Sequence, residues 1–431
     1  MRVSTGMIFS AGLASIQKQT SSLLHTQQQV ASGRRILTPA DDPVAAARAL
    51  EVEQARDTNA LYQTNQKTAG ENLGLAEGRL VSVGELIRNV RTLAVQGGNG
   101  ALTDADRRSI ATELRQRFDE LLGLANATDG SGQHLFSGYM GDTQPFSGSV
   151  AAGVAYAGDE GQRRLQVSAS RQVAVSDSGN DIFMRIRNGN GSFVTSVSVS
   201  NAGTGVIDAG TVTDPAKWNA AGNGKDFTVR FDVDNTVNPP VTTYDLVDNA
   251  SGNSLLTGAP AAGSGPYVRT FSPGQAIVLK NQGAEPAFDF GAQLIISGRP
   301  ADGDTFDLDA SSSQSLFATL GNLIDALETT TAMGSGNTLL ANRIGFALTD
   351  LDQAQENLLR VRAGIGSRMN EIDSLASAGE DLNLNYQETL SRLRDLDYAA
   401  AISQLTQEQG YLEAAQKSFL RVTDLSLFNY V

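Results

Sequence analysis

The stretch that decides the fold is VEQARDTNALYQTNQKTAGENLGLAEGRLVSVGELIRNVRTLA, residues 52–94. Uncharged side chains recur at every seventh position, and a second series follows three residues behind the first. Alternating steps of three and four residues are typical of a helix that packs along a partner in a coiled coil. The series are Val52, Asn59, Gln66, Leu73, Leu80, Ile87, Ala94 and Ala55, Tyr62, Ala69, Ala76, Val83, Val90. The stretch therefore predicts one long helix with a partner helix along one face.

The partner is predicted near the other end of the chain, over residues 344–375, where the same spacing returns. Its two series are Ile344, Leu351, Leu358, Ile365, Ile372 and Ala347, Ala354, Val361, Arg368, Leu375. Together with a shorter helix near 103–126, these helices predict an elongated antiparallel bundle.

Local signals set the ends of the predicted helices. Asp42-Pro43 is typical of a helix N-cap followed by proline at the first helical position. The run Gly97-Gly98-Asn99-Gly100 is expected to end the long helix. Thr103 to Asp106 resembles a capping box and should open the short helix.

The middle of the chain has a different composition. Residues from about 135 to 312 are rich in Gly, Asn, Thr, Ser and Val, and contain alternating stretches such as 227–233. Alternation with a period of two predicts half-buried strands, so an antiparallel β domain is expected, with Trp218 in its core. The predicted fold class is α+β: an elongated antiparallel helical bundle or coiled coil, formed by the N- and C-terminal regions, with this β domain inserted.

The predicted domains follow from these boundaries. Residues 1–45 and 386–431 are the halves of an inner coiled-coil domain, 46–170 and 313–385 the halves of a helical bundle domain, and 171–312 an inserted β-rich outer domain.

The two ends of the chain carry a weaker version of the seven-residue pattern. Its apolar positions are Phe9, Ile16, Leu23 and Val30 at one end, and Tyr398, Leu405, Leu412 and Phe419 at the other. The companion positions are mostly Thr and Gln, and Lys18 is the one fully charged residue between Met7 and Gly33. Such a seam buries too little apolar surface to hold a lone helix in water, so both ends are expected to become ordered on assembly. The alternative is an ordinary surface amphipathic helix.

Composition excludes several classes of function. The formal net charge of -14 argues against a nucleic-acid groove or an anionic membrane surface as partner. With no cysteine, disulfides, thiolate metal sites and cysteine nucleophiles are all absent. The N-terminus has no continuous apolar segment of a cleaved signal peptide, and no stretch is long and apolar enough to span a membrane. If the protein is exported, the signal is expected to stay uncleaved.

Motifs for chemistry are missing. His25 and His134 are far apart and outside any HExxH motif, and no serine lies in a GxSxG frame. The GxG pairs lack the third glycine of a dinucleotide-binding turn, and no P-loop is present. The stretch from Asp232 lacks the glycine and glutamate of a calcium loop. Asp302, Asp304, Asp307 and Asp309 could gather a weak cation, but solvated turn carboxylates are the preferred interpretation. No enzyme activity, cofactor or metal site is predicted.

Four segments resemble the flagellin superfamily, and within it most closely the hook-associated protein 3 family of hook–filament junction proteins. They are MRVSTGMIFS (1–10), VASGRRILTPADDPVAAARAL (30–50), RVRAGIGSRMNEID (360–373) and LEAAQKSFLRVTDLSLFNYV (412–431). The ASGRRI and ADDP sequences are specific for the superfamily only, whereas the MRVST start and the SLFNYV end favour the junction family. The resemblance covers about 1–145 and 313–431.

The resemblance implies a non-enzymatic structural subunit of the bacterial flagellum, extracellular and needed for motility. Its terminal segments would pair as a coiled coil that lines a tube, with Phe9, Ile16, Leu23 and Val30 against Tyr398, Leu405, Leu412 and Phe419 as the assembly interface. Secretion would use flagellar type III export without a cleaved signal peptide. The implied partners are further copies of itself, the adjacent hook-associated junction protein, filament flagellin and an export chaperone on the C-terminal helix, within 398–425. Neither nucleic acid nor membrane insertion is implied.

The joint between coil and bundle contains Arg34, Arg35, Asp41 and Asp42, which either form ion pairs within or between subunits or belong to a solvated, capped turn. Two alternatives for the whole chain stay open. One is filament flagellin itself, and the other is an outer β domain that serves as a binding or adhesion module on the same stem.

Overall fold

The computed structural model of the chain describes residues 5–330 and 334–424. The MRVST and SLFNYV sequences therefore lie outside the described residues, apart from Thr5. The chain divides into two compact units. Unit 1 comprises Met1–Lys67, Gln166–Arg171 and Ile372–Val431, and unit 2 comprises Thr68–Leu165 and Gln172–Glu371.

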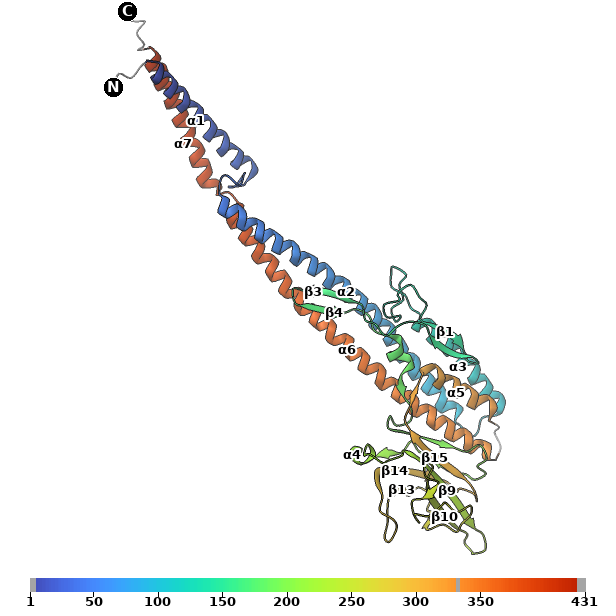
Figure 1. Cartoon of the computed structure of the whole chain (residues 1–431). Helices are drawn as coiled ribbons and strands as arrows, with labels where there is room; N and C mark the ends of the chain where they lie inside the picture. The colour runs from blue at the N-terminus through green and yellow to red at the C-terminus, as the bar shows by residue number, and fades with distance from the viewer. Residues whose placement is uncertain (1–4, 331–333, 425–431) are drawn as a thin grey trace, which may run out of the picture. The chain divides into compact units, whose positions relative to one another are not determined.

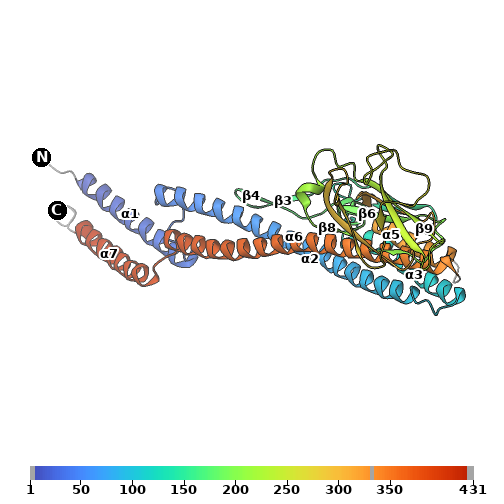
Figure 2. The same ribbon diagram turned by 90° about the horizontal axis from the view of Figure 1, so that it is seen from below.

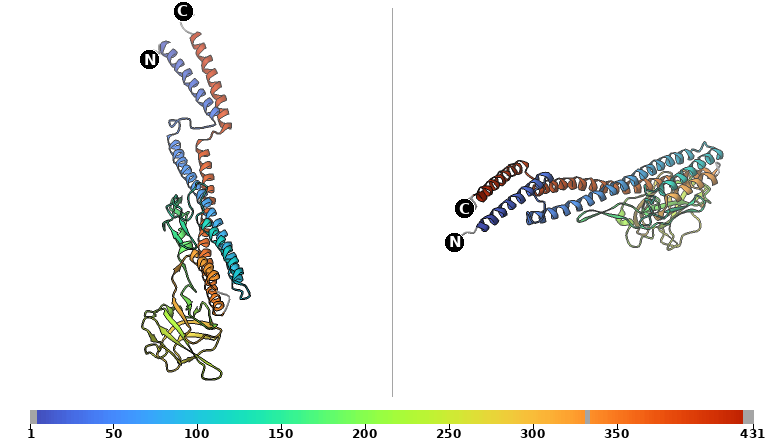
Figure 3. Two further views of the ribbon diagram at one scale, coloured as in Figure 1. Left: turned by 90° about the vertical axis from the view of Figure 1, so that its right-hand side faces the viewer. Right: turned by 90° about the horizontal axis from the view of Figure 1, so that it is seen from above.

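Unit 1 is built from helices of the two ends of the chain. Helix α1 (Thr5–Ser32) lies beside α7 (Tyr398–Asp424), and the start of α1 is next to the end of α7, so the pair is antiparallel (Figures 1 and 3). The first part of α2 (Pro43–Gly97) and the last part of α6 (Ser335–Arg394) complete it. Both long helices continue into unit 2.

The predicted helix ends are confirmed. Helix α2 begins at Pro43, where the Asp42 carboxylate accepts a hydrogen bond from the backbone N–H of Ala45 at 2.9 Å, and it ends at Gly97. Helix α3 (Asp104–Ala125) opens with a full capping box, because the Thr103 and Asp106 side chains each accept a hydrogen bond from the other residue's backbone N–H. Two otherwise unpaired donors of the first turn are satisfied in this way.

In unit 2 the predicted ladders are buried. Leu73, Leu80 and Ile87 of α2 are at most 2% exposed. The same holds for the α6 ladder, whose members Ile344, Leu351, Leu358 and Ile365 are at most 5% exposed. The Leu358 side chain packs directly on the backbone of α2, since a Cβ added at Gly84 would lie 3.3 Å from Leu358 Cδ2. Burial of such ladders is the main source of stability for a helical bundle.

A further helix was not predicted as a separate element. Helix α5 (Leu316–Thr329) precedes α6 and packs on α3, with the rings of Phe118 and Phe317 5.7 Å apart. The ion pair of Arg115 and Glu328 joins the same two helices. Sequence reasoning had treated the region from 313 onward as continuous helix, because the apolar pattern alone gave no break.

Short strands and one π-helical turn follow α3. They are β1 (Phe146–Ser149), β2 (Gly153–Tyr156), β3 (Arg164–Ser168), β4 (Arg171–Ala174), η1 (Asn180–Met184) and β5 (Ile186–Arg187). The β1–β2 and β3–β4 pairs are two-stranded sheets, and β5 pairs with β16 (Ser313–Gln314). Apart from β16, these elements lie in the chain between α3 and the larger sheets of unit 2, except that Gln166–Arg171 of the β3–β4 hairpin belongs to unit 1.

The predicted antiparallel β domain is confirmed as two sheets within unit 2. Figure 2 shows their strands β6, β8 and β9 gathered in one region. The larger sheet contains β6 (Phe193–Val197), β9 (Asp226–Asp234), β10 (Val241–Asp248), β11 (Asn253–Ser254), β12 (Arg269–Thr270) and β15 (Thr305–Ala310). The smaller sheet contains β7 (Val206–Ile207), β8 (Thr211–Val212), β13 (Ala276–Lys280) and β14 (Asp289–Ser297). One apolar core lies between them, and it includes Phe227, Val229 and Phe231 of the alternating stretch.

Trp218 is a core residue, as predicted, with 2% of its surface exposed. It lies in the short helix α4 (Pro215–Trp218) rather than in a strand, and its ring is 5.1 Å from that of Phe193. Long terminal helices with antiparallel sheets in the middle confirm the α+β fold class, whereas the five-part domain division stays a prediction. Among the described helices, none has the length and apolar character that crossing a bilayer requires.

Candidate functional site: the terminal helix pair

The α1–α7 pair is held together by close contacts at both of its ends. The rings of Phe9 and Phe419 have centroids 5.1 Å apart. Gly12 leaves room for the second ring, since a Cβ there would lie 2.6 Å from Phe419 Cδ2. At the other end, a Cβ on Gly33 would lie 2.8 Å from the Tyr398 hydroxyl. The structure therefore brings together Phe9, the first predicted seam residue in the chain, and Phe419, the last.

The predicted seam is only partly covered by this pairing. Ile16, Leu23, Val30, Leu405, Leu412 and Phe419 are half-buried. Phe9 and Tyr398 are each 51% exposed. Among the residues of the pair whose burial the structure describes, the fully buried ones are Thr26 and Ala401, at 1% and 5% exposure, and sequence reasoning missed both. Small side chains on facing helices are the signal that could have found them, because they let two backbones approach. The role of the eight seam residues in assembly stays a prediction.

Large apolar side chains of the pair remain exposed. They are Met7, Phe9, Leu13 and Leu24 on α1, and Tyr398, Ile402, Tyr411 and Leu420 on α7. Single exposed apolar residues are normal, but several of them on α1, which carries the one full charge of Lys18 between Met7 and Gly33, are typical of an interaction surface. Each such side chain is already about half buried, so its full burial by a neighbouring molecule would contribute about 1 kcal/mol.

The joint beside the pair is fixed by backbone hydrogen bonds. The N–H of Arg35 donates to the Arg394 carbonyl at 2.8 Å, and the N–H of Leu396 donates to the Gly33 carbonyl at 3.0 Å. Gly33 has a positive φ of 68°, which favours glycine. Arg35 also donates from its side chain to the carbonyl of Leu393 at 2.9 Å. The turn after α1 is thereby tied to the turn before α7.

The charged residues of the joint form both an ion pair within the subunit and a capped turn, the two arrangements that the sequence left open. Arg35 and Asp42 form an ion pair at 3.2 Å within the subunit. Asp41 caps the turn, because its carboxylate accepts the N–H groups of Leu37 and Thr38 at 2.9 and 2.8 Å. The Thr38 N–H bond holds the pKa of Asp41 below its usual value. The Ala45 N–H bond, with help from Arg35, lowers the pKa of Asp42 in the same way.

The start of α2 and the end of α6 are clamped just beyond the joint. Arg394 donates two hydrogen bonds to the Glu53 carboxylate, at 3.1 and 2.9 Å. This bidentate pair lowers the pKa of Glu53, first through the hydrogen bond and then through the charge of Arg394.

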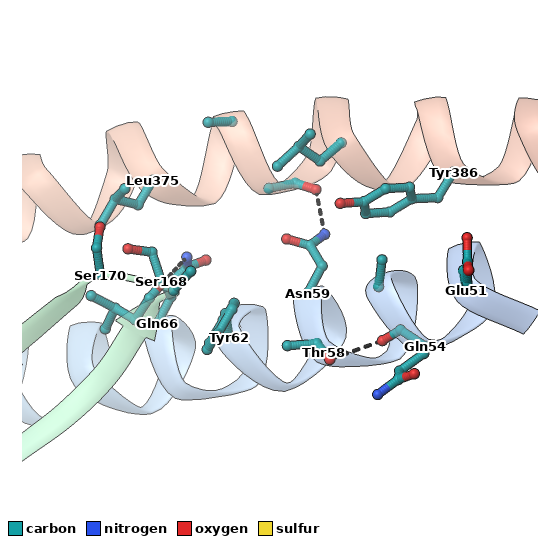
Figure 4. A pocket seen from close by; sticks show the side chains of 16 residues that line it. Glu51, Gln54, Thr58, Asn59, Tyr62, Gln66, Ser168, Ser170, Leu375 and Tyr386 are labelled. Carbon is teal, nitrogen blue, oxygen red and sulfur yellow. Dashed lines mark hydrogen bonds between the residues drawn. The ribbon is translucent and has the colours of Figure 1, made fainter.

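A groove of about 560 Å³ follows along α2 and α6 within unit 1 (Figure 4). Asn59 and Tyr62 of α2 line it together with Leu375 and Tyr386 of α6, and Ser168 of the β3–β4 hairpin lies at one end. Its lining is uncharged apart from Glu51.

Candidate residues for chemistry have structural partners elsewhere in the described chain. The Asp304 carboxylate accepts the backbone N–H groups of Ala202, Gly203 and Ala301, at 2.8–3.1 Å. Asp307 accepts a hydrogen bond from the Thr228 hydroxyl at 2.6 Å. Across residues 5–330 and 334–424, no three His, Cys, Asp or Glu side chains are grouped as metal ligands.

Comparison with known proteins agrees with this arrangement. Residues 3–140 match the bacterial flagellin N-terminal helical region. The flagellar hook-associated protein 3 of Escherichia coli is 26% identical over 429 residues, covering 99% of this chain and 99% of that protein. Polar flagellin C of Vibrio parahaemolyticus is 23% identical over 437 residues, covering 97% of this chain and 95% of that protein.

Two solved structures extend the comparison to the fold. The flagellar junction protein FlgL from Legionella pneumophila is 27% identical, with a TM-score of 0.68, and covers 81% of this chain and 100% of its own. FlgL from Xanthomonas campestris is 28% identical, with a TM-score of 0.65, and covers 79% of this chain and 99% of its own. The predicted resemblance to the flagellin superfamily, and within it to hook-associated protein 3, is confirmed.

Proposed function

We propose that this chain, a relative of flagellar hook-associated protein 3, is a structural subunit of the bacterial flagellum that joins the hook to the filament. Copies of the chain assemble through the α1–α7 pair. One face of the assembly contacts the adjacent hook-associated junction protein, and the other contacts filament flagellin.

The observation that carries the proposal is the incomplete burial of the α1–α7 pair. Exposed apolar residues such as Leu13 and Leu24 lie on a helix that carries a single full charge, Lys18, between Met7 and Gly33. Charged groups normally cover a helix face that stays in water. Neighbouring copies would bury these side chains, and many such seams formed at once would make the assembly cooperative.

Filament flagellin is the alternative within the same superfamily. Hook-associated protein 3 of Escherichia coli matches this chain at higher identity than polar flagellin C, 26% against 23%, over nearly the whole length of both. The junction proteins from Legionella and Xanthomonas share the fold over about four fifths of the chain. Copy number separates the two functions, because a filament needs thousands of copies per cell and a junction needs few.

The proposal includes the route to the outside and the absence of catalysis. The chain is exported through the flagellar channel without cleavage of a signal peptide, and an export chaperone binds within 398–425 until export. A helix with exposed Ile402, Tyr411 and Leu420 needs such cover before assembly, because exposed apolar surface promotes aggregation. The chain acts as a scaffold and has no enzymatic role.

Deletion of the gene tests the proposal. We expect hooks without filaments in electron micrographs, with unpolymerised filament protein in the medium. The intact gene should restore filaments, and so should Val199→Asp, which adds a charge at a 75% exposed site in unit 2. Leu24→Asp, at a 53% exposed site on α1, should not restore them. Normal filaments on the deletion strain, or full rescue by Leu24→Asp, would refute the proposal.

A further inference from the structure

The seam between α2 and α6 changes character along its length. In unit 2 the facing positions are apolar and closely packed, as Leu80, Ile87 and Leu358 show with exposures of 0–2%. In unit 1 the next positions of the α2 ladder are Asn59 and Gln66, which are 8% and 4% exposed. Polar side chains at such positions specify register but reduce the stability of a coiled coil.

The polar seam of unit 1 is also loosely filled. The groove of about 560 Å³ lies along the same turns of α2 and α6, between Glu51 and Gln66 on one helix and between Leu375 and Tyr386 on the other. The groove is open to solvent, so the side chains that line it have water on one side and fewer protein atoms to pack against than side chains in a closed apolar seam. The two helices are therefore held less firmly here than along an apolar ladder.

A few directional hydrogen bonds replace apolar packing in this stretch. The Asn59 amide donates to the Gly379 carbonyl at 2.8 Å, and a Cβ on Gly379 would lie 3.5 Å from Asn59 Oδ1 (Figure 4). The Gln66 amide donates to the carbonyl of Val167 in the hairpin at 2.7 Å. Gln66 Oε1 is buried and accepts no hydrogen bond from the described residues, so the amide is only half satisfied. A partly satisfied polar network destabilises its surroundings.

We propose that the polar seam, residues 52–66 of α2 and 375–386 of α6, is a built-in pliable joint of unit 1. Within it the two helices shift against each other, using the free volume of the groove and exchanging hydrogen bonds, while the bidentate pair of Glu53 and Arg394 keeps their ends together. In a subunit that joins a hook to a filament, which rests on the proposed function, such a joint lets one chain fit two lattices. The pliability itself does not depend on that function.

Hydrogen exchange of the whole, unassembled chain tests the joint. Backbone amides of 52–66 and 375–386 should exchange at least about tenfold faster than those of 73–94 and 344–365, because local opening follows the density of buried apolar contacts. The double variant Asn59→Leu/Gln66→Leu continues the apolar ladder into unit 1. It should slow exchange in both segments by about tenfold and leave the unit 2 ladder unchanged.

Two further variants serve as a control outside the groove and as a second way to fill it. Ala60→Leu adds the same kind of side chain on an exposed face of α2 outside the groove, and should change nothing. Ala378→Leu fills the groove from α6 and should slow exchange in the same two segments if the double variant fails to fold. Equal exchange in the two seams of the native chain, or unchanged exchange when the groove is filled in a folded variant, would overturn the proposal. Neither result depends on whether the chain functions at the junction.

Discussion

The two units of the chain use the same helical pattern with opposite results. Among the described residues, buried hydrophobic side chains of unit 1 number six, namely Ala45, Ala49, Val167, Ile372, Leu390 and Ala401, so large apolar side chains contribute little to its core. Unit 2 buries aromatic and aliphatic side chains throughout, including Phe118, Phe146, Phe317 and Leu320. Unit 2 therefore has an apolar core of its own, whereas unit 1 leaves much of its apolar surface exposed, as the proposed assembly role requires.

The comparison teaches where the free energy of each unit comes from. Folding must offset the loss of conformational entropy, about 1–2 kcal/mol for the backbone of each residue, mainly by burying apolar surface. Unit 2 does this within one chain. Unit 1 keeps Phe9, Leu24 and Tyr411 exposed, and in the proposed assembly neighbouring copies would bury them.

Removal of either helix of the α1–α7 pair should have the largest effect on incorporation of the chain into flagella. A chain without residues 1–35, or without 398–431, should stay soluble and keep the thermal unfolding transition of unit 2, because the core of unit 2 is intact. It should not enter flagella, since the assembly surface is gone. Immunogold labelling of cell-borne flagella measures incorporation, and normal labelling with either truncated chain contradicts the assignment of unit 1 to assembly.

Replacing one leucine by alanine in each unit should show that unit 2 depends on it for stability and unit 1 for assembly. Leu80→Ala, at a fully buried site in unit 2, should lower the free energy of unfolding by about 2–5 kcal/mol. Leu405→Ala, at a half-buried site on α7, should cost the isolated chain less than about 1 kcal/mol yet impair assembly. Urea unfolding followed by circular dichroism gives the first quantity, and filament counts give the second. Similar losses of unfolding free energy for the two variants would contradict the difference in stability proposed between the two units.

The ring pair of Phe9 and Phe419 offers a finer test. A double-mutant cycle with alanine should give a coupling of about 0.5–1.5 kcal/mol, as for other aromatic pairs at this distance. Hydrogen exchange over α1 and α7 measures it, because the pair opens locally. The cycle on Phe118 and Phe317 in unit 2 is the control, with rings 5.7 Å apart and both residues 1% exposed. Zero coupling would contradict a contact between the Phe9 and Phe419 rings in solution.

Acid should loosen the joint of unit 1 slightly. The pKa values of Asp41, Asp42 and Glu53 are lowered by their hydrogen bonds, so these groups stabilise the fold above their unfolded values of 3.8 for Asp and 4.5 for Glu. That contribution is lost as pH falls through the lowered values.

Acid should have the opposite effect on stability at Asp350 in unit 2. Burial raises the pKa of this carboxyl despite hydrogen bonds from Gly189 and Gln314. Its charged form is disfavoured in the fold, so acid protonates it without a loss of stability. Carboxylate chemical shifts followed by NMR between pH 6 and about 3 check both directions. If the backbone amides of residues 33–42 became better protected from hydrogen exchange on acidification, the predicted loosening of the joint would be contradicted.

Much of the fold could be predicted from particular residues. Pro43, Gly97 and Thr103 set helix ends through local geometry and hydrogen bonds, which depend on neighbours in sequence. The break between α5 and α6 was missed, and so was the arrangement of strands from β1 to β16, because pairing partners are far apart in the chain. Of the candidate site, the eight seam positions could be named in advance. Thr26 and Ala401 were missed because neither is distinguished by its hydrophobicity, and the small size of their side chains is the signal that could have found them.

The sequence by itself determined the helical ends, the β-rich middle and the seven-residue spacing, because each is a periodic property of consecutive residues. It also placed amides at positions 59 and 66 of an otherwise apolar ladder. Only the tertiary structure decided that Asn59 donates to the Gly379 carbonyl, that a groove opens beside it, and that Leu13, Leu24 and Tyr411 stay exposed. Those outcomes depend on how distant segments approach one another, and the spacing of residues along one chain does not specify that approach.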